Sequence, residues 1–275
     1  MTIFHALILG IVQGLTEFLP ISSSGHLIVF PELLGWPEQP LAFDTTLHLG
    51  TAAALIIYFY KDLVALMTNF IKDFFVHRFN FKKYSRNGKF GLKIILASIP
   101  AGILGFSLQS FLEATFRGTL WVALFMLLGT LLMAFAEIEY KSSKSIDTKE
   151  SPTYLDSLFI GFFQSLALLS GVSRSGATIS GGMLLGLKRD EAARFSFILS
   201  IPIILAAGLS QLVGLEGGSM GLTVMHLLVG FVASALVGYL AVDFLIKFLK
   251  TKSLWPFIVY RVVLFVFLIG FVVLR

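Results

Sequence analysis

Long apolar stretches, separated by short polar or charged segments, make up most of the chain. Six of them approach the ~20 residues that an α-helix needs to cross the hydrocarbon core of a bilayer. They are too long and too continuous to be the strands of a membrane barrel. We therefore predict six transmembrane helices, at about residues 43–61, 92–112, 120–138, 193–213, 224–246 and 255–274.

Two further apolar stretches, at about residues 1–30 and 155–186, are interrupted by polar residues. Pro20 and three consecutive serines break the first stretch, so neither half reaches the length of a membrane span. A re-entrant hairpin fits both stretches: a helix enters, turns at membrane depth and returns. Such a turn is tolerated only where protein covers it or where it lines a wet cavity.

The two hairpin stretches also resemble each other. Residues 13–28 align without a gap to residues 164–179, an offset of 164 − 13 = 151. Identical residues occupy the pairs Gln13/Gln164, Leu15/Leu166, Ser22/Ser173, Ser24/Ser175, Gly25/Gly176 and Ile28/Ile179. One hairpin opens each half of the chain, so the sequence predicts an all-α membrane protein built from two repeats, and these are inverted if the hairpins enter from opposite sides of the membrane. The single domain, 1–275, then has three parts: a first repeat at about 1–138, a linker at 139–152 and a second repeat at about 153–275.

Composition agrees with a membrane protein. Apolar residues make up 56% of the chain and charged residues 13%, with a mean hydropathy of +0.88. Soluble domains carry roughly twice that charged fraction. There is no cysteine, which excludes disulfides, thiol chemistry and cysteine-ligated metals. Nothing in the sequence indicates nucleic-acid binding.

Basic residues predict the orientation in the membrane. Of the 21 Lys and Arg residues, 17 fall on one face of this arrangement, while the opposite face has only Arg117 and Arg275. Arg174 and Arg261 lie within membrane segments. Cytoplasmic loops are the ones enriched in Lys and Arg. Both termini are therefore predicted to be extracytoplasmic, with the two hairpins entering from opposite sides.

Polar residues of the two hairpins are the candidates for chemistry. Glu17 lies among apolar residues, and an intramembrane carboxylate usually faces a cavity or a partner. Arg174 in the second hairpin supplies that partner, with a donor fork that matches phosphate oxygens. Ser23 is a candidate nucleophile, and His26 a candidate general acid or base. We expect these four groups to surround a phosphate, with their functional atoms within about 10 Å of a common point.

The serines and glycines at the two turns are candidates for binding the substrate. Each turn is predicted to open a short helix, whose free N–H groups and dipole attract anions. The candidate residues are Ser22, Ser24, Gly25, Ser173, Ser175, Gly176 and Thr178. A purely structural alternative stays open, in which serine caps the returning helix, glycine eases the turn and Thr178 bonds its own backbone.

Other polar residues are interpreted more conservatively. Gln13 and Glu17 share one helix face and could hold a divalent cation together with pyrophosphate, although this spacing alone is a weak signal. Asp44 and His48, at the start of the first span, are interpreted as ordinary helix-end polarity. Arg261 is expected to form an ion pair with Asp243 on the preceding span.

Two motifs resemble those of a known family. The sequence Q-G-L-T-E-F-L-P-I-S-S-S-G-H at 13–26 and G-V-S-R-S-G-A-T-I-S-G-G at 171–182 are similar to the two motifs of the BacA-type undecaprenyl-pyrophosphate phosphatases. The resemblance extends over essentially the whole chain in length, spacing and span layout. It places Gln13 and Glu17 on the acidic, metal-associated element, Ser23 and His26 on the proposed catalytic pair, and Ser173 with Arg174 on the phosphate-binding motif. The one departure is Gln13, where glutamate is also common.

The resemblance implies hydrolysis of undecaprenyl diphosphate within the bacterial inner membrane, aided by Mg²⁺ or Ca²⁺. It also implies recycling of the lipid carrier for cell-wall polymers, bacitracin as a competitor for the substrate, and an active site facing the extracytoplasmic side. Whether Ser23 or a water attacks phosphorus stays open, as do metal preference and homo-oligomerisation. A lipid flippase or transporter of the same architecture is the alternative, since inverted repeats with broken helices are typical of transporters.

Overall fold

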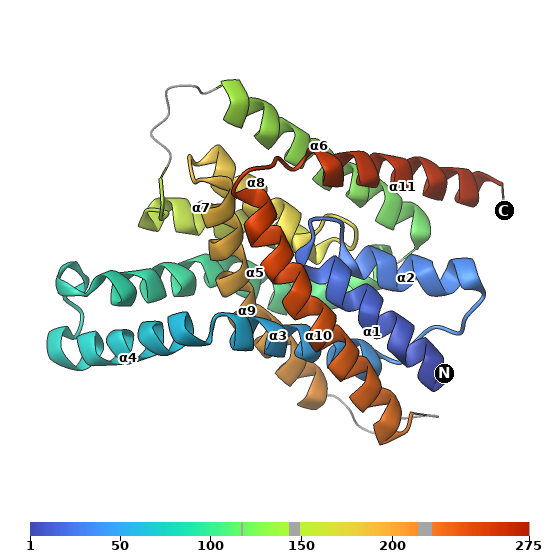
Figure 1. Cartoon of the computed structure of the whole chain (residues 1–275), viewed down its shortest axis with the longest axis horizontal. Helices are drawn as coiled ribbons and strands as arrows, with labels where there is room; N and C mark the ends of the chain where they lie inside the picture. The colour runs from blue at the N-terminus through green and yellow to red at the C-terminus, as the bar shows by residue number, and fades with distance from the viewer. Residues whose placement is uncertain (117, 143–148, 214–221, 275) are drawn as a thin grey trace.

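The computed structural model describes residues 1–116, 118–142, 149–213 and 222–274. Within these ranges the chain is helical and forms no β-strand (Figure 1). The helices are α1 Ile3–Phe18, α2 Ser23–Leu34, α3 Leu41–Tyr58, α4 Tyr60–His77, α5 Arg86–Phe116, α6 Thr119–Ser142, α7 Tyr154–Ser165, α8 Arg174–Leu184, α9 Arg189–Val213, α10 Val224–Leu249 and α11 Trp255–Val273, with 3₁₀ turns η1 Phe81–Lys83 and η2 Leu166–Leu168.

The six predicted spans are confirmed. Among the described residues, six helices are long and apolar enough to cross a membrane: α3, α5, α6, α9, α10 and α11. Each overlaps one of the stretches predicted from the sequence. The chain is therefore an all-α integral membrane protein. Directly after the first span, α4 packs against α5.

Both interrupted stretches form helical hairpins. The first consists of α1 and α2, and the second of α7, η2 and α8. With 16 residues in α1 and 12 in α7, the entering helices are only about 24 and 18 Å long at ~1.5 Å per residue. In Figure 1 the first hairpin enters from the side that holds both termini and the second from the opposite side, so their turns meet in the middle of the molecule. This is the inverted arrangement predicted from the repeat.

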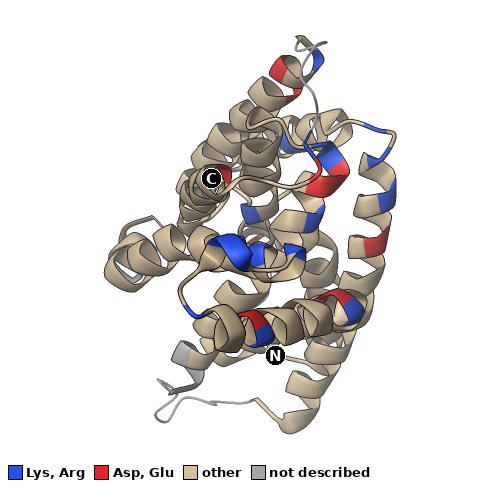
Figure 2. Ribbon diagram, turned by 90° about the vertical axis from the view of Figure 1, so that its left-hand side faces the viewer, with Lys and Arg blue, Asp and Glu red and all other residues tan. Residues whose placement is uncertain are grey.

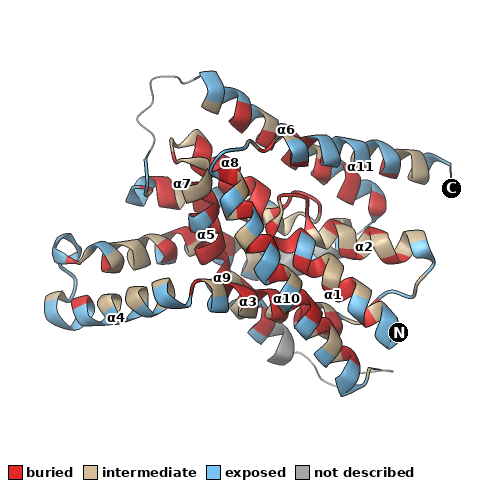
Figure 3. Cartoon of the chain, viewed as in Figure 1, coloured by how far each residue is buried: buried red, intermediate tan, exposed pale blue. Residues whose placement is uncertain are grey.

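Close helix packing fixes the depth of the first hairpin. α1 lies against α10, where a Cβ added at Gly14 would come within 2.8 Å of the backbone nitrogen of Gly238. Small residues at such contacts let two membrane helices approach closely. At the end of α1, Phe18 is fully buried and meets Phe197 of α9 edge to face, with ring centroids 5.5 Å apart. Figure 3 shows that buried residues concentrate around this central region.

The side chain of Arg261 occupies an unexpected place. Its predicted ion pair with Asp243 is wrong, because Asp243 instead binds Lys247 at 2.7 Å and accepts a hydrogen bond from Tyr58. The physical reason is that α10 packs against α1, α3 and α9, whereas α11 packs against α6. Arg261 therefore points toward α6 and the hairpin turns, where it is fully buried.

The end of the molecule away from the termini carries many of its charged residues. Figure 2 looks onto this end and shows Lys and Arg distributed over it, together with several carboxylates. This agrees with the basic face predicted from the sequence, although Lys144 of that face and Arg117 and Arg275 of the opposite face lie outside the described residues. The orientation in the membrane stays a prediction.

Candidate active site

The two hairpin turns have the same construction. Ser22 and Ser173 adopt positive φ angles of 75° and 76°, which are strained for a residue with a Cβ. Each serine caps the following helix, because its hydroxyl accepts a hydrogen bond from the backbone N–H of Gly25 or Gly176. The identical pairs in the aligned repeats therefore fold alike, and the capping role considered for these serines is confirmed.

The two turns face a common cavity of about 330 Å³. Helices α2 and α8 both begin at its wall, and the N-terminus of a helix offers free N–H groups and a positive dipole to an anion. The lining residues are Glu17, Ser22, Ser23, Ser24, Leu41, Asp44, Thr45, His48, Ala101, Gln164, Ala167, Leu168, Ser170, Ser173, Arg174, Ile203, Ile204, Ala207 and Gly208.

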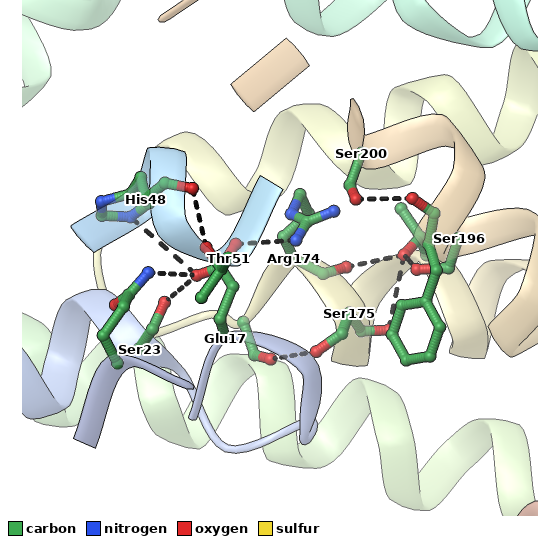
Figure 4. A network of polar contacts seen from close by, with 12 residues as sticks. Glu17, Ser23, His48, Thr51, Arg174, Ser175, Ser196 and Ser200 are labelled. Atoms are coloured by element: carbon green, nitrogen blue, oxygen red, sulfur yellow. Dashed lines mark hydrogen bonds and ion pairs between the residues drawn. The ribbon is translucent and has the colours of Figure 1, made fainter. Parts of the chain in front are cut away.

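Glu17 connects the two repeats at this cavity (Figure 4). Its Oε1 accepts a hydrogen bond from Nη2 of Arg174 at 2.7 Å, so the predicted proximity of the two side chains is confirmed. Its Oε2 accepts one from the hydroxyl of Ser23 at 2.5 Å and another from Nε2 of Gln13 at 3.2 Å. The carboxylate is thus placed to hold the guanidinium and to take a proton from the serine.

His48 is the histidine on the cavity wall, and the interpretation of it as helix-end polarity missed this. Its Nδ1 lies 2.8 Å from the carbonyl oxygen of Asp44, and because a carbonyl only accepts, Nδ1 carries the proton. Its Nε2 lies 3.9 Å from Oε2 of Glu17. The i, i+4 spacing of Asp44 and His48 was the available signal, but the sequence did not show that this helix face meets Glu17.

His26 does not line the cavity, contrary to expectation. Its Nδ1 lies 2.7 Å from the carbonyl oxygen of Ser22, and its Nε2 lies 2.7 Å from the hydroxyl of Tyr260. Both ring nitrogens are therefore engaged in holding the first turn against α11. A direct catalytic role for His26 stays a prediction, and this geometry favours a supporting one.

Several predicted binding residues lie behind the cavity wall. The hydroxyl of Ser175 donates to the carbonyl of Leu19 at 3.2 Å, which ties the second turn to the first. Thr178 donates to the carbonyl of Arg174 at 2.8 Å and contacts the hydroxyl of Ser196 at 2.5 Å. These groups, with the cap-forming Gly25 and Gly176, position the residues that reach the cavity, which are Ser22, Ser23, Ser24, Ser173 and Arg174.

The residues around Gln13 can be tested against a divalent cation. Gln13 is fully buried, and its Oε1 has no hydrogen-bond partner in the described part of the chain. The same part contains no group of three or more His, Cys, Asp and Glu that could hold a metal. Mg²⁺ commonly binds through one or two carboxylates together with substrate phosphates. These residues therefore fit a cation that arrives with a diphosphate, and they do not fit a resident ion.

One side of the cavity is apolar. Leu168 of η2 and Ile203, Ile204 and Ala207 of α9 contribute to it. The cavity extends from the hairpin turns to Leu41 at the start of α3 and to Ala207 and Gly208 toward the end of α9. A charged end at membrane depth with an apolar wall suits an amphiphile whose headgroup is an anion.

Comparison with known proteins agrees with this chemistry. A family model described as bacitracin resistance protein BacA matches residues 6–267. A protein of Trichlorobacter lovleyi named undecaprenyl-diphosphatase is 45% identical over 265 residues, covering 95% of this chain and 94% of that protein. A protein of the same name from Geotalea daltonii is 44% identical over 264 residues, covering 95% of each chain. A third of that name, from Methanosphaera stadtmanae, is 41% identical over 270 residues, covering 94% of each.

Proposed function

Because this chain belongs to the BacA family, we propose that it is a membrane phosphatase that hydrolyses undecaprenyl diphosphate to undecaprenyl phosphate and inorganic phosphate. The observation that carries the proposal is the contact of Glu17 with both Ser23 and Arg174 at one cavity. A nucleophile, a base and a phosphate-binding guanidinium therefore meet where two helix N-termini converge. The reaction would recycle the lipid carrier for peptidoglycan and other cell-wall polymers, and bacitracin would compete for the same lipid diphosphate.

Binding of the diphosphate would use the positive groups of the second hairpin. Arg174 keeps one guanidinium nitrogen, Nη2, on Glu17, while its Nη1 has no partner among the described residues. That nitrogen can donate to a phosphate oxygen without breaking the ion pair. Backbone N–H groups at the starts of α2 and α8 add donors, as in other anion sites at helix N-termini. The apolar wall would hold the first isoprene units.

Phosphoryl transfer would then begin at Ser23. Its oxygen attacks the terminal phosphorus while Glu17 accepts the hydroxyl proton, and the bond from phosphorus to the bridging oxygen breaks. Undecaprenyl phosphate leaves, and a water hydrolyses the phosphoserine to restore Ser23 and release phosphate. In the alternative, Ser23 and Glu17 orient a water that attacks directly. Acid quenching during turnover of substrate labelled in the terminal phosphate separates the two, since only the first route leaves label on the protein.

A divalent cation, Mg²⁺ or Ca²⁺, would be held by Glu17 and Gln13 together with the diphosphate oxygens. When bound, it would neutralise charge that develops on the transferring phosphoryl group. Because the described residues offer so few ligands, the protein alone should bind the cation weakly. Calorimetric titration with Mg²⁺ in the absence of diphosphate tests this, and a stoichiometric micromolar site would contradict it.

We further propose that the cavity opens to the extracytoplasmic side of the bacterial inner membrane, where both termini would lie. The excess of basic residues at the opposite end supports this orientation. Because the chain contains no cysteine, single cysteines introduced near residues 36 and 85 can be labelled without a background. The first should react with an impermeant reagent in intact cells and the second only after lysis; the reverse pattern would overturn the orientation.

The decisive experiment is phosphate release from undecaprenyl and farnesyl diphosphate by the purified protein in detergent, with and without EDTA. Glu17→Gln should lose at least about 100-fold in rate, the scale of removing a group that acts in the transition state. Glu150→Gln, which changes an exposed carboxylate, serves as the matched control and should behave as wild type. A flippase or transporter of the same architecture would release no phosphate in micelles, and that outcome would refute the proposed activity.

A further inference from the structure

Gln164 is a buried amide with no partner for either of its polar atoms. It lies near the end of α7, is 2% exposed and forms part of the cavity wall. Neither Nε2 nor Oε1 has a hydrogen bond within the described ranges. Buried polar groups are nearly always paired, because an unpaired one loses its bonds to water without replacement. An orphaned amide at a binding cavity therefore indicates a partner that comes from outside the chain.

Comparison of the two repeats explains why the amide of Gln164 has no partner. Gln164 corresponds to Gln13 at the offset of 151, and Leu168 corresponds to Glu17. In the first repeat the amide donates to the carboxylate four residues later, at 3.2 Å. In the second repeat leucine occupies that position and can accept nothing. The glutamine is thus retained in the second hairpin without the acceptor that its counterpart uses.

A second unpaired donor lies on the same cavity. Nη1 of Arg174 is also buried and without a partner among the described residues. The cavity of about 330 Å³ therefore presents an amide and a guanidinium nitrogen, both from the second hairpin, that no described residue satisfies. A diphosphate carries several anionic oxygens, each an acceptor, and can pair with both.

We propose that Gln164 contacts the lipid-linked phosphate of the substrate, donating from Nε2 to one of its oxygens. This inference rests on the proposed function and adds a substrate contact to it. The assignment to the lipid-linked phosphate follows from position. Ser23 and Glu17, which are proposed to act on the terminal phosphorus, belong to the first hairpin, whereas Gln164 is followed along the second hairpin by Ala167 and Leu168, two apolar residues of the cavity lining. Gln164 would thus hold the phosphate that remains on the product.

Replacing Gln164 by leucine tests the proposal, with Gln13→Leu as the matched control at the equivalent position. Gln164→Leu removes an unsatisfied amide, so the melting temperature without ligand should stay within about 2 °C of wild type or rise. Gln13→Leu removes a donor to Glu17, so its melting temperature should fall. A structural role for Gln164 would instead make both variants lose stability.

Kinetics give the second readout. For Gln164→Leu, the KM for farnesyl diphosphate and the inhibition constant for farnesyl monophosphate should both rise about tenfold, as for loss of one charge-assisted hydrogen bond. The inhibition constant for inorganic phosphate should change less than about twofold, because that product never occupies the lipid-linked subsite. Unchanged constants for both farnesyl ligands would overturn the proposal, and an equal rise for inorganic phosphate would overturn the assignment to the lipid-linked phosphate.

The outcome remains separable from that of the proposed function. If the wild-type protein releases no phosphate, the hydrolase proposal fails. The rise in melting temperature that farnesyl monophosphate produces still decides the role of Gln164. A rise in wild type that is lost in Gln164→Leu supports the contact, and an equal rise in both proteins refutes it.

Discussion

Replacing Arg261 by lysine keeps a positive charge on α11 but removes the planar guanidinium that connects α6 with both hairpin turns. The side chain is fully buried and donates five hydrogen bonds, all to uncharged acceptors. They run to the Thr130 hydroxyl at 2.8 Å and to the carbonyls of Met126 at 2.7 Å, Gly171 at 3.0 Å, Val172 at 3.1 Å and Pro20 at 3.4 Å. A single ammonium cannot reach acceptors on three separate segments, so we expect at least two buried carbonyls to lose their donor.

The magnitude follows from those orphaned carbonyls. Each buried acceptor left without a partner costs about 1–3 kcal/mol, so two cost about 2–6 kcal/mol. At about 2–4 °C per kcal/mol for a chain of this size class, a mid-range loss of about 4 kcal/mol lowers the melting temperature by about 8–16 °C. Turnover should also fall at least about tenfold, because displacing catalytic groups by ~1 Å can cost up to 100-fold.

The assay combines thermal unfolding in detergent with phosphate release per folded molecule, and it needs a control for general destabilisation. Arg189 supplies one, since it binds both carboxylate oxygens of Glu137, at 2.9 and 2.6 Å, and does not line the cavity. Arg189→Lys should lose stability while keeping turnover within about twofold. If Arg261→Lys melts within about 2 °C of wild type with normal turnover, or if both variants lose turnover equally, the role of Arg261 in holding the turns is refuted.

Three further predictions concern other groups. Arg174→Lys keeps the charge but loses the donor fork, so turnover should fall at least about 100-fold, and near-normal phosphate release would mean that the fork is not used. His48→Ala removes the imidazole beside Glu17 and should lower turnover with little change in melting temperature, whereas His26→Ala releases the first turn from Tyr260 and should lower both; the reverse pattern in the same two assays would favour the direct catalytic role predicted for His26. Hydrogen bonds from the hydroxyl and backbone N–H of Ser85 hold the pKa of Asp73 below its ordinary 3.8. Their stabilisation of the α4–α5 connection is therefore complete above that value and lost as pH falls below it. Hydrogen exchange at 78–88 should accelerate below about pH 3.8 in wild type and lose this pH dependence in Asp73→Asn.

Most of the fold could be predicted because the positions of the spans and hairpins follow from the hydropathy of the chain. Six stretches of span length form six spans. In the two remaining stretches a polar break leaves each half too short to span, and these stretches form hairpins. These outcomes depend on local composition and on the requirement that backbone groups in lipid be paired within the protein. The ungapped repeat then placed Glu17 and Arg174 in equivalent hairpins, and their ion pair followed from geometry that the repeat imposes.

The residues that the sequence misplaced all depend on which helix packs beside which. His48 and His26 cannot be told apart by their polarity. The packing of α3 beside α1 brings His48 near Glu17, whereas α2 lies near α11 and His26 contacts Tyr260 there. Arg261 follows Asp243 closely along the chain, but α11 leaves α10 and packs against α6. No local pattern encodes that choice, because any face of an apolar helix can meet another helix or lipid.

One of the two arginines near the turns has no carboxylate partner within the described residues. Glu17 compensates Arg174, but Arg261 donates only to hydroxyl and carbonyl oxygens and has no carboxylate partner there. Its guanidinium contacts the carbonyl of Val172, the residue directly before Ser173, so this positive charge lies just behind the second turn. Two unit charges about 8 Å apart attract by about 2 kcal/mol at an effective dielectric of about 20. An anion bound at the turn would therefore be stabilised by Arg261 without touching it. For this reason Arg261→Met should weaken inhibition by inorganic phosphate more than Arg261→Lys does, although both variants lose hydrogen bonds that the guanidinium makes to the turns. Equal inhibition constants for the two variants would show that Arg261 acts through geometry alone.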